Sequence, residues 1–530
     1  MIGSRFRSAL LGGPLLLAAC QTVPVSPAAE IADMLVVNGT LYDGTGGAAR
    51  QFDVAISQGK ILAIGPELAG RYRAKSTLDA SGLIVSPGFI DPHTHAGSDL
   101  ASSQTLRRAN SAYIHQGVTT VMVGNDGYGD PGIAALAANA KANGIGTNAA
   151  YLAGFGPIRE AVLGKANRAP RPEDLARMKT ATRQAMCEGA WGLSAGLYYV
   201  PQNYAQTSEV IALAKIASSF GGYYDTHMRD ESTYNITVTG AVEEAIEIGR
   251  QAGIPVHIAH IKALGPAVWG QSKPMIEAIE KARAEGLRVT ADQYPWKASG
   301  TRFSNALVPR WALEGGLDRL RERLADNEQL AKIRDGMIAG LKRRGGAERL
   351  LTTGPLDGAD VPLGKTLAEL ADSAGLSPVD TAIAILKQGD SRVASFNMDA
   401  ADIAAFAKRD WVVTGSDGST GHPRKYASFP KAYRDLVTNG NMGISRFIRR
   451  SSGMTADIIG LQDRGYLKEG YAADLVLFDS QAFAPIADYQ SPREISAGVR
   501  HLLVNGVSVI SDGEYTGALP GTPLLKQAGC

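Results

Sequence analysis

Four histidines and one aspartate stand at the ends of short apolar runs that are far apart in the chain. His93 and His95 end the stretch PGFIDPHTH, His227 follows YYDT, His260 ends HIAH, and Asp417 ends TGSD. Because residues two apart on a strand point to the same face, His93 and His95 can reach one common spot. Imidazole and carboxylate groups that converge in this way are typical ligands of Zn²⁺ or a similar divalent ion.

Convergence is what separates a metal site from ordinary polar residues in this sequence. One such histidine alone is more often a satisfied core or capping residue, whereas several at matching strand ends indicate a common site. His257 and His260 are three apart and face opposite sides of a strand. We therefore predict that only His260, which is nearer the following loop, is a ligand.

The elements that carry these residues alternate between short apolar runs and helical stretches. This pattern is typical of a parallel barrel or a doubly wound sheet, and eight runs favour an α/β fold with a (β/α)8 TIM-like barrel. Active sites of such barrels lie at the carboxyl ends of the strands, where the histidines and Asp417 fall. The eight predicted strands are residues 83–91, 119–124, 149–154, 192–197, 222–226, 255–260, 288–292 and 411–415.

The gap before the eighth predicted strand is much longer than the others. It contains charged helical stretches, which are residues 317–327, 330–344 and 378–387. We predict an inserted subdomain at about residues 297–400, after barrel strand seven, that forms one wall or a lid of the active site. The barrel as a whole is assigned to residues 87–463.

Both ends of the chain outside the barrel have the texture of β-strands. Near the start, short alternating runs surround Asn38-Gly39 and Gln58-Gly59, which are hairpin-type turns. Near the end, runs at 473–478, 499–504 and 507–510 surround Asn505-Gly506. We predict one small β-sandwich domain built from residues 33–86 and 464–525.

The first 20 residues read as an export signal. Arg5 and Arg7 precede the apolar run 9–17, and Leu17-Ala18-Ala19-Cys20 resembles a bacterial lipobox. The resemblance implies cleavage before Cys20, lipidation of its thiol, and a tether at residues 21–32. Gln21 after the cysteine resembles the outer-membrane sorting pattern, so the expected location is the periplasmic face of that membrane. Beyond this signal, no apolar run is long enough to span a bilayer.

Charge and cysteine content exclude other classes of protein. The 54 Lys and Arg against 52 Asp and Glu give a net charge of +2, which is no electrostatic footprint for nucleic acid. Three cysteines cannot build a disulfide framework. With Cys20 lipidated, Cys187 and Cys530 remain, and Cys187 lies in a helical pattern that predicts a small core residue.

Together the motifs resemble the amidohydrolase superfamily, and more closely its N-acyl-D-amino-acid deacylase (D-aminoacylase) family. The resemblance runs from about Asp33 to Leu525. The combination of VGN, DQYP and GSDG…HPR is the part of the resemblance that is most specific to this family. The matching stretches are PGFIDPHTH (87–95), GVTTVMVGNDG (117–127), GLSAGLYYVP (192–201), THMRDE (226–231), HIAHIK (257–262), DQYP (292–295), GSDG (415–418), HPRKY (422–426) and GYLKEGYAAD (465–474).

The resemblance implies a role for each residue that matches these motifs. His93 and His95 would hold one metal position with Asp417 nearby, His227 and His260 would hold the other, and Asp417 would be the general base. The residues implied in gripping the substrate, above all its α-carboxylate, are Tyr199, Lys262, Tyr294 and Arg424. Arginine offers a planar fork to a carboxylate and lysine a point charge.

One position departs from the family. After the Gly-Asn of strand two the family typically has a metal-binding Cys, and this chain has Asp126. We predict that Asp126 is a ligand, although Asn-Asp-Gly is also an ordinary turn signal. One or two divalent ions are expected, with Zn²⁺ first; the harder carboxylate shifts preference toward Mn²⁺ or similar metals.

The implied activity is metal-dependent hydrolysis of N-acyl-D-amino acids to a carboxylate and a free D-amino acid. Water activated by the metal would attack the amide, with Asp417 moving the proton. A dipeptidase or a cyclic-amide hydrolase of the same superfamily is the first alternative, and both also act on small molecules. A lipid-anchored binding protein without catalysis is the second, with Asp126 as its only support.

Overall fold

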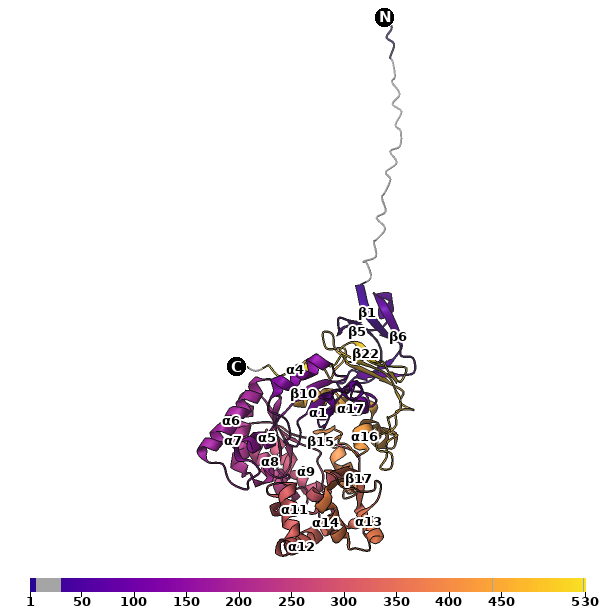
Figure 1. The fold of residues 1–530 in the computed structure, drawn as a ribbon. Coiled ribbons are helices and arrows are strands. Elements are labelled where there is room, and N and C mark those ends of the chain that lie inside the picture. Colours follow the sequence, from indigo (N-terminus) through magenta and orange to yellow (C-terminus); the bar gives the residue numbers. More distant parts are fainter. Residues whose placement is uncertain (6–29, 441, 528) are drawn as a thin grey trace.

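The computed structural model describes residues 1–5, 30–440, 442–527 and 529–530. Three parts follow one another from top to bottom in Figure 1: a β-sandwich, a barrel surrounded by helices, and a smaller subdomain that carries α11 to α14. Cys20 and almost all of the predicted signal and tether lie outside the described residues. Within those residues, no helix is long and apolar enough to cross a membrane.

Eight parallel strand positions form the barrel, in the predicted order. The third position is interrupted at Leu152, so it consists of two short strands. The barrel strands are β8 (Phe89–Asp91), β9 (Val118–Val123), β10 (Asn148–Tyr151), β11 (Ala153–Gly154), β12 (Gly192–Gly196), β13 (Tyr223–His227), β14 (Val256–Ile258), β15 (Val289–Gln293) and β19 (Val412–Thr414). Neighbours pair in parallel, and a bridge between Thr94 and Gly418 joins the first position to the last. The predicted TIM-like barrel is confirmed.

Helices on the outside of the barrel bury their apolar faces against these strands. Between β8 and β9 lie the short helices α1 (Gly97–Leu100), α2 (Thr105–Arg108) and α3 (Ser111–Ile114). The longer helices between later strands are α4 (Ile133–Asn143), α5 (Phe155–Leu163), α6 (Pro172–Cys187), α7 (Thr207–Ser219), α8 (Thr237–Ala252), α9 (Ser272–Ala284) and α15 (Ala400–Ala407). After the last strand follow α16 (Arg424–Tyr433), α17 (Ile444–Ser451) and α18 (Gly453–Ile459). Phe89 lies at the centre of the resulting aromatic core, where its ring stacks on Phe429 at 5.5 Å.

An inserted subdomain lies between β15 and β19, where the sequence predicts an insertion after barrel strand seven. A three-stranded antiparallel sheet of order β16-β18-β17 is covered by helices and has its own apolar core. Its strands are β16 (Ser299–Arg302), β17 (Leu350–Leu356) and β18 (Asp390–Ser395). Its helices are α10 (Phe303–Leu307), α11 (Leu317–Ala325), α12 (Asn327–Arg343), α13 (Leu367–Ala374) and α14 (Pro378–Gln388).

Both ends of the chain build the β-sandwich, which has one sheet of order β5-β4-β1-β6 and one of order β23-β22-β21-β20-β7-β2-β3. β7 and β20 pair antiparallel and so join the two ends of the sequence. The first sheet contains β1 (Glu30–Val37), β4 (Asp53–Ser57), β5 (Lys60–Gly65) and β6 (Tyr72–Asp79). The second contains β2 (Thr40–Leu41), β3 (Arg50–Gln51), β7 (Ile84–Pro87), β20 (Leu475–Phe478), β21 (Val499–Val504), β22 (Val507–Ser511) and β23 (Glu514–Tyr515).

Two local predictions about strands and turns were wrong. The run 83–91 is not one barrel strand: β7 belongs to the sandwich and β8 to the barrel, and they separate at Gly88, where a Cβ would lie 2.2 Å from Thr119. Asn38-Gly39 is not a hairpin turn, because β1 and β2 lie in different sheets. Gln58-Gly59 does join the antiparallel strands β4 and β5, as expected.

The prediction that Cys187 is a small core residue was also wrong. Cys187, at the end of α6, forms a disulfide with Cys530, with 5.8 Å between their Cα atoms. The C-terminal tail brings Cys530 there because β24 (Pro523–Leu524) pairs with β10 of the barrel instead of joining the sandwich. Lys526 then donates its backbone N–H to Gly189 O, close to the end of α6. Helix position alone could not reveal this contact.

Candidate active site

The loops after β8 and β9 fix the first two histidines. The Asn125 side chain donates to Pro92 O at 3.0 Å and accepts from the Thr94 N–H at 3.3 Å, which ties the two loops together. Asp417 N–H donates to His93 O at 3.0 Å, so the loop after β19 is held against the same segment. His93 is fully buried and the His95 side chain is 31% exposed.

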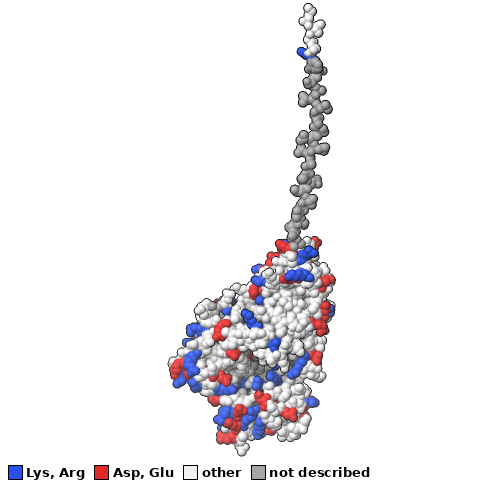
Figure 2. Space-filling view, turned by 45° about the horizontal axis from the view of Figure 1, so that its top comes forward, with Lys and Arg blue, Asp and Glu red and all other residues white. Residues whose placement is uncertain are grey.

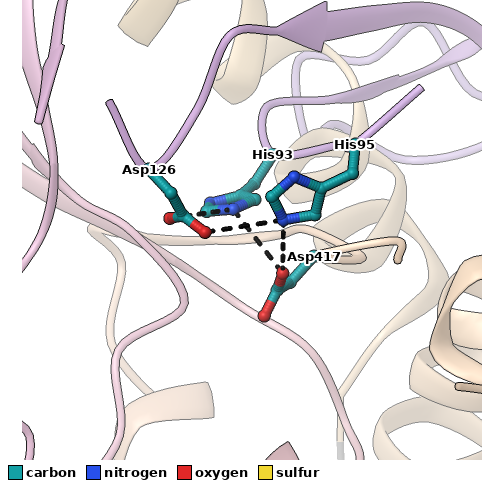
Figure 3. Close-up of side chains that lie close together, drawn as sticks. All are labelled: His93, His95, Asp126 and Asp417. Atoms are coloured by element: carbon teal, nitrogen blue, oxygen red, sulfur yellow. Dashed lines mark hydrogen bonds and ion pairs between the residues drawn. The ribbon is translucent and has the colours of Figure 1, made fainter. Parts of the chain in front are cut away.

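Asp126 lies at the centre of the imidazole groups. Its Oδ1 is 3.4 Å from His93 Nε2, 3.6 Å from His227 Nδ1 and 3.4 Å from His260 Nε2, and its Oδ2 is 3.5 Å from His95 Nε2. Figure 3 shows Asp126, His93, His95 and Asp417 pointing toward one another. Burial alone would raise the pKa of Asp126, but the charge of His93 and the neighbouring imidazoles of His227 and His260 hold it well below the ordinary range.

The side chains form two groups that could each hold a metal ion, and Asp126 belongs to both. One group is His93, His95, Asp126 and Asp417; the other is Asp126, His227 and His260. Within each group the ligand atoms lie within 4.8 Å of one another. Both ring nitrogens of His93, Nε2 of His227 and Oδ1 of Asp126 are buried without a hydrogen-bond partner among the described residues. Residues for a binuclear metal site are therefore present, and their orphaned atoms fit one.

Glu231 and Lys262 contact the two histidines of the second metal-ligand group. Lys262 Nζ donates to Glu231 Oε1 at 2.6 Å and lies 2.8 Å from His260 Nδ1, and Glu231 Oε2 lies 3.6 Å from His227 Nε2. Burial would raise the pKa of Glu231, but His227, Lys262 and His260 hold it well below the usual range. No role for Glu231 was predicted; its place four residues after His227 was the available signal.

Asp292 is a second residue that sequence reasoning missed. It is fully buried at the end of β15, where its Oδ2 lies 3.1 Å from His257 Nε2 and 3.7 Å from His93 Nδ1. Such a carboxylate orients the imidazole that contacts it. His257 therefore lies beneath the site and His260 within it, the division that the strand period predicted. Asp292 ends a barrel strand as the ligands do, which was the signal that could have identified it.

Three of the predicted site residues adopt the left-handed backbone region. The φ angles are 56° at Asp126, 36° at His260 and 48° at Asp417. Non-glycine residues seldom adopt this region, and each costs on the order of 1–3 kcal/mol unless its surroundings hold it there. Strained backbone at three converging loops is typical of a functional site.

Asp417 lies between the first histidine pair and an arginine. Its Oδ1 is 3.2 Å from His95 Nε2 and 3.7 Å from His93 Nε2, and its Oδ2 is 2.5 Å from Arg424 Nη1. Burial would raise the pKa of Asp417, but Arg424 first and His260 next hold it below its ordinary range. Arg424 is 2% exposed at the start of α16, and its Nη2 donates to Ser419 Oγ at 3.0 Å.

A cavity of about 390 Å³ opens over these groups. His95, Asp126, His227, His260 and Asp417 line it, and so do Tyr199, Lys262 and Arg424 among the predicted substrate residues. The Tyr199 hydroxyl lies 3.4 Å from His227 Nδ1. Tyr294, the fourth predicted substrate residue, is buried and does not line this cavity; its ring packs 4.9 Å from the Arg424 guanidinium and its hydroxyl faces Met398.

Comparison with known proteins places this site in a family. No model of a protein family matches the chain. The D-aminoacylase of Alcaligenes xylosoxydans xylosoxydans is 31% identical over 527 residues, which cover 94% of this chain and 98% of that protein. This chain belongs to the D-aminoacylase family of the amidohydrolase superfamily. The predicted resemblance is thereby confirmed.

Other members of the family are similar over nearly the whole chain. The N-acyl-D-aspartate deacylase of the same organism is 31% identical over 521 residues, covering 92% of this chain and 93% of that protein. The crystal structure of N-acyl-D-glutamate deacylase from Bordetella bronchiseptica, complexed with zinc and a phosphonate inhibitor, is 28% identical with a TM-score of 0.78. That match covers 94% of this chain and all of the other. The protein is thus a metal-dependent amidohydrolase of D-aminoacylase fold.

Proposed function

We propose that the protein hydrolyses N-acyl-D-amino acids to a carboxylic acid and a free D-amino acid. The observation that carries the proposal is the pair of metal-ligand groups that share Asp126, one of which includes Asp417 next to the cation of Arg424. A divalent ion held by these groups would act as a Lewis acid that polarises the amide carbonyl and lowers the pKa of water. Two ions are proposed, with Zn²⁺ first.

Asp417 is the proposed general base. Its side chain is 6% exposed, lines the cavity and belongs to the first metal-ligand group, so a water held there is within its reach. Asp417 takes a proton from that water as the water oxygen bonds to the amide carbon, and it returns the proton to nitrogen as the carbon–nitrogen bond breaks. Positioned proton transfer of this kind contributes about 10²–10⁴-fold to rate.

Arg424 is the proposed partner of the substrate α-carboxylate. Its guanidinium is buried, carries donors in a planar fork, and has an Nε with no hydrogen-bond partner among the described residues. A substrate carboxylate that pairs with Arg424 would compete with Asp417 for the positive charge of the guanidinium, which now lowers the pKa of Asp417. The base would then be freed as the substrate binds.

A lipid anchor at Cys20 and a periplasmic location are part of the proposal. The signal-like residues 1–20 support them. The Cys187–Cys530 disulfide adds support, because disulfides persist in oxidising compartments such as the bacterial periplasm. Cys20→Ser should leave the protein unprocessed or detached from membranes; normal fractionation and maturation of that variant would contradict the anchor.

A substrate panel tests the activity. The protein, extracted in detergent, is incubated with matched N-acetyl-D- and N-acetyl-L-amino acids, a dipeptide and a cyclic amide, and released amine is measured. Hydrolysis of the D-compounds should stop with chelator and return with divalent metal. Turnover of only the dipeptide or the cyclic amide would refute the proposed function.

A further inference from the structure

One wall of the cavity comes from the inserted subdomain and carries three arginines. Arg302, Arg344 and Arg392 all line the cavity, and none forms an ion pair with a carboxylate among the described residues. The other two cations of the cavity are paired, Arg424 with Asp417 and Lys262 with Glu231. Positive charge in the cavity therefore exceeds what the carboxylates around it compensate.

Arg302 and Arg392 are the least satisfied of the three. Arg344 donates to the hydroxyls of Tyr234 at 3.0 Å and Tyr198 at 3.1 Å. Neither Arg302 nor Arg392 donates a side-chain hydrogen bond to any residue that the structure describes, although both are half-buried. The carboxylate of Asp390 accepts hydrogen bonds from Ser304 and Ser391 and forms no ion pair with Arg302, and burial raises its pKa against the opposite effect of the Arg302 charge.

The register of strands β16 and β18 brings the side chains of Arg302 and Arg392 next to each other. Arg302 of β16 is directly opposite Arg392 of β18, so the two project from one face of the sheet. Like charges in this arrangement repel. Partial burial and the charge of Arg302 lower the pKa of Arg392, against a weaker opposite effect of Asp357. The sheet thus carries an unfavourable pair that an anion from outside the chain would relieve.

The same face looks toward the reacting centre. A Cβ on Gly300 would lie 2.9 Å from Arg424 Nη2, so the face of β16 that holds Gly300 is turned to Arg424. Arg302 is two residues further along and on the same face, about 6.6 Å away at the usual rise of a strand. Arg424 and the Arg302–Arg392 pair therefore line the same cavity from neighbouring positions.

We propose that Arg302 and Arg392 form a second anion subsite, and that the substrate carries a carboxylate besides the one held by Arg424. The inference rests on the proposed function and narrows its substrate class to dianionic N-acyl amino acids. The second carboxylate can belong to the amino-acid side chain or to the far end of the acyl group. Similarity does not choose among side chains, since relatives named D-aminoacylase and N-acyl-D-aspartate deacylase are equally identical at 31%.

Two pairs of substrates separate the sources of the second charge. N-acetyl-D-glutamate is compared with N-acetyl-D-glutamine, and N-succinyl-D-leucine with N-succinamyl-D-leucine, each pair differing only by carboxylate against amide. The wild-type protein should prefer the charged member of at least one pair by about tenfold or more in kcat/KM, the lower end for a charge-assisted hydrogen bond. The preferred pair identifies the source.

Variants assign the preference to the subsite. Arg302→Gln with Arg392→Gln should remove the charge preference, and the corresponding double lysine variant should keep part of it. If the double variant does not fold, the two single glutamine variants replace it, and each should lower the ratio of kcat/KM between the charged and the neutral substrate. Lys387→Gln, which removes an exposed cation of the same subdomain away from the cavity, should change neither the ratio nor the activity.

Failure of the subsite and failure of the proposed function give different results. Equal kcat/KM within both pairs, or a preference that survives in the double glutamine variant, would overturn the subsite. If no N-acyl compound is hydrolysed, binding of the same four compounds is measured by calorimetry. Charge-selective binding that the double variant loses would then support the subsite without the activity, and its absence would overturn the subsite.

Discussion

Replacing Asp126 by Asn tests the centre of the site with a minimal change of shape. Asn tolerates the left-handed backbone that Asp126 adopts at φ 56°, so the loop conformation should survive. The amide loses the negative charge and leaves one neutral oxygen in place of two that face four imidazole nitrogens at 3.4–3.6 Å. The change therefore removes ligand chemistry and little else.

The expected loss follows from the position of Asp126 in both metal-ligand groups. A residue that only supports a ligand typically changes metal affinity about 10–100-fold. Because Asp126 belongs to both groups, its replacement should lower the affinity for at least one ion by more than about 100-fold, or roughly 2.7 kcal/mol of binding free energy. Metal content should fall from two ions to one or fewer per chain.

Stoichiometry and chelator competition measure the effect. Metal content is determined by mass spectrometry after gel filtration, and affinity by titration against a chelator. Asp225→Asn is the matched control, because Asp225 is also a buried carboxylate of a barrel strand, β13, but belongs to neither ligand group. If Asp126→Asn binds as much metal and as tightly as Asp225→Asn, Asp126 is not a ligand.

Three further perturbations have defined outcomes. Asp417→Asn should lower kcat by at least about 100-fold with metal still bound, and full turnover in a steady-state assay would rule out Asp417 as the base. Cys187→Ser should cost about 2–5 kcal/mol in urea unfolding under oxidising conditions, since it opens a bridge between residues 343 apart; unchanged stability would show that the disulfide does not form. Hydrogen bonds from Lys75 and the Gln58 N–H lower the pKa of Asp33 from 3.8, so this stabilisation is present above that value and is lost as pH falls through the lowered one. Asp33→Asn should therefore flatten the decline in stability between about pH 5 and 2, and an unchanged slope in urea titrations would contradict the assignment.

The barrel and the convergence of its histidines could be predicted because both follow from local pattern. Apolar runs separated by amphipathic helices determine a parallel barrel, and the barrel itself brings the carboxyl ends of its strands together. The predicted histidine ligands and the predicted base each lie at or just past the end of a barrel strand, so the barrel places them at one common end. These residues are His93, His95, His227, His260 and Asp417. Asp126 was assigned by comparison with a family position, and the structure brings it to the centre of the same group.

The features that escaped prediction depend on contacts between distant parts of the chain. Cys187 meets Cys530 only because the C-terminal tail runs along the barrel beside β10. Arg302 faces Arg392 only through the antiparallel register of β16 and β18, which neither strand encodes by itself. Asn38-Gly39 has the sequence of a tight hairpin, but the chain changes sheets there, because β1 pairs with β6 while β2 pairs with β7.

The exchange of a family cysteine for Asp126 has a geometric consequence. A thiolate would offer both metal-ligand groups the same single atom. The carboxylate offers two: Oδ1 faces His93, His227 and His260, while Oδ2 faces His95 alone. Carboxylate oxygen is a harder ligand than thiolate sulfur, so Asp126 would favour metals such as Mn²⁺ more than a thiolate would. Asp126→Cys should therefore shift metal preference toward Zn²⁺, and the direction of that shift, measured by competition between the two metals, distinguishes a ligand from a carboxylate that only shapes the loop.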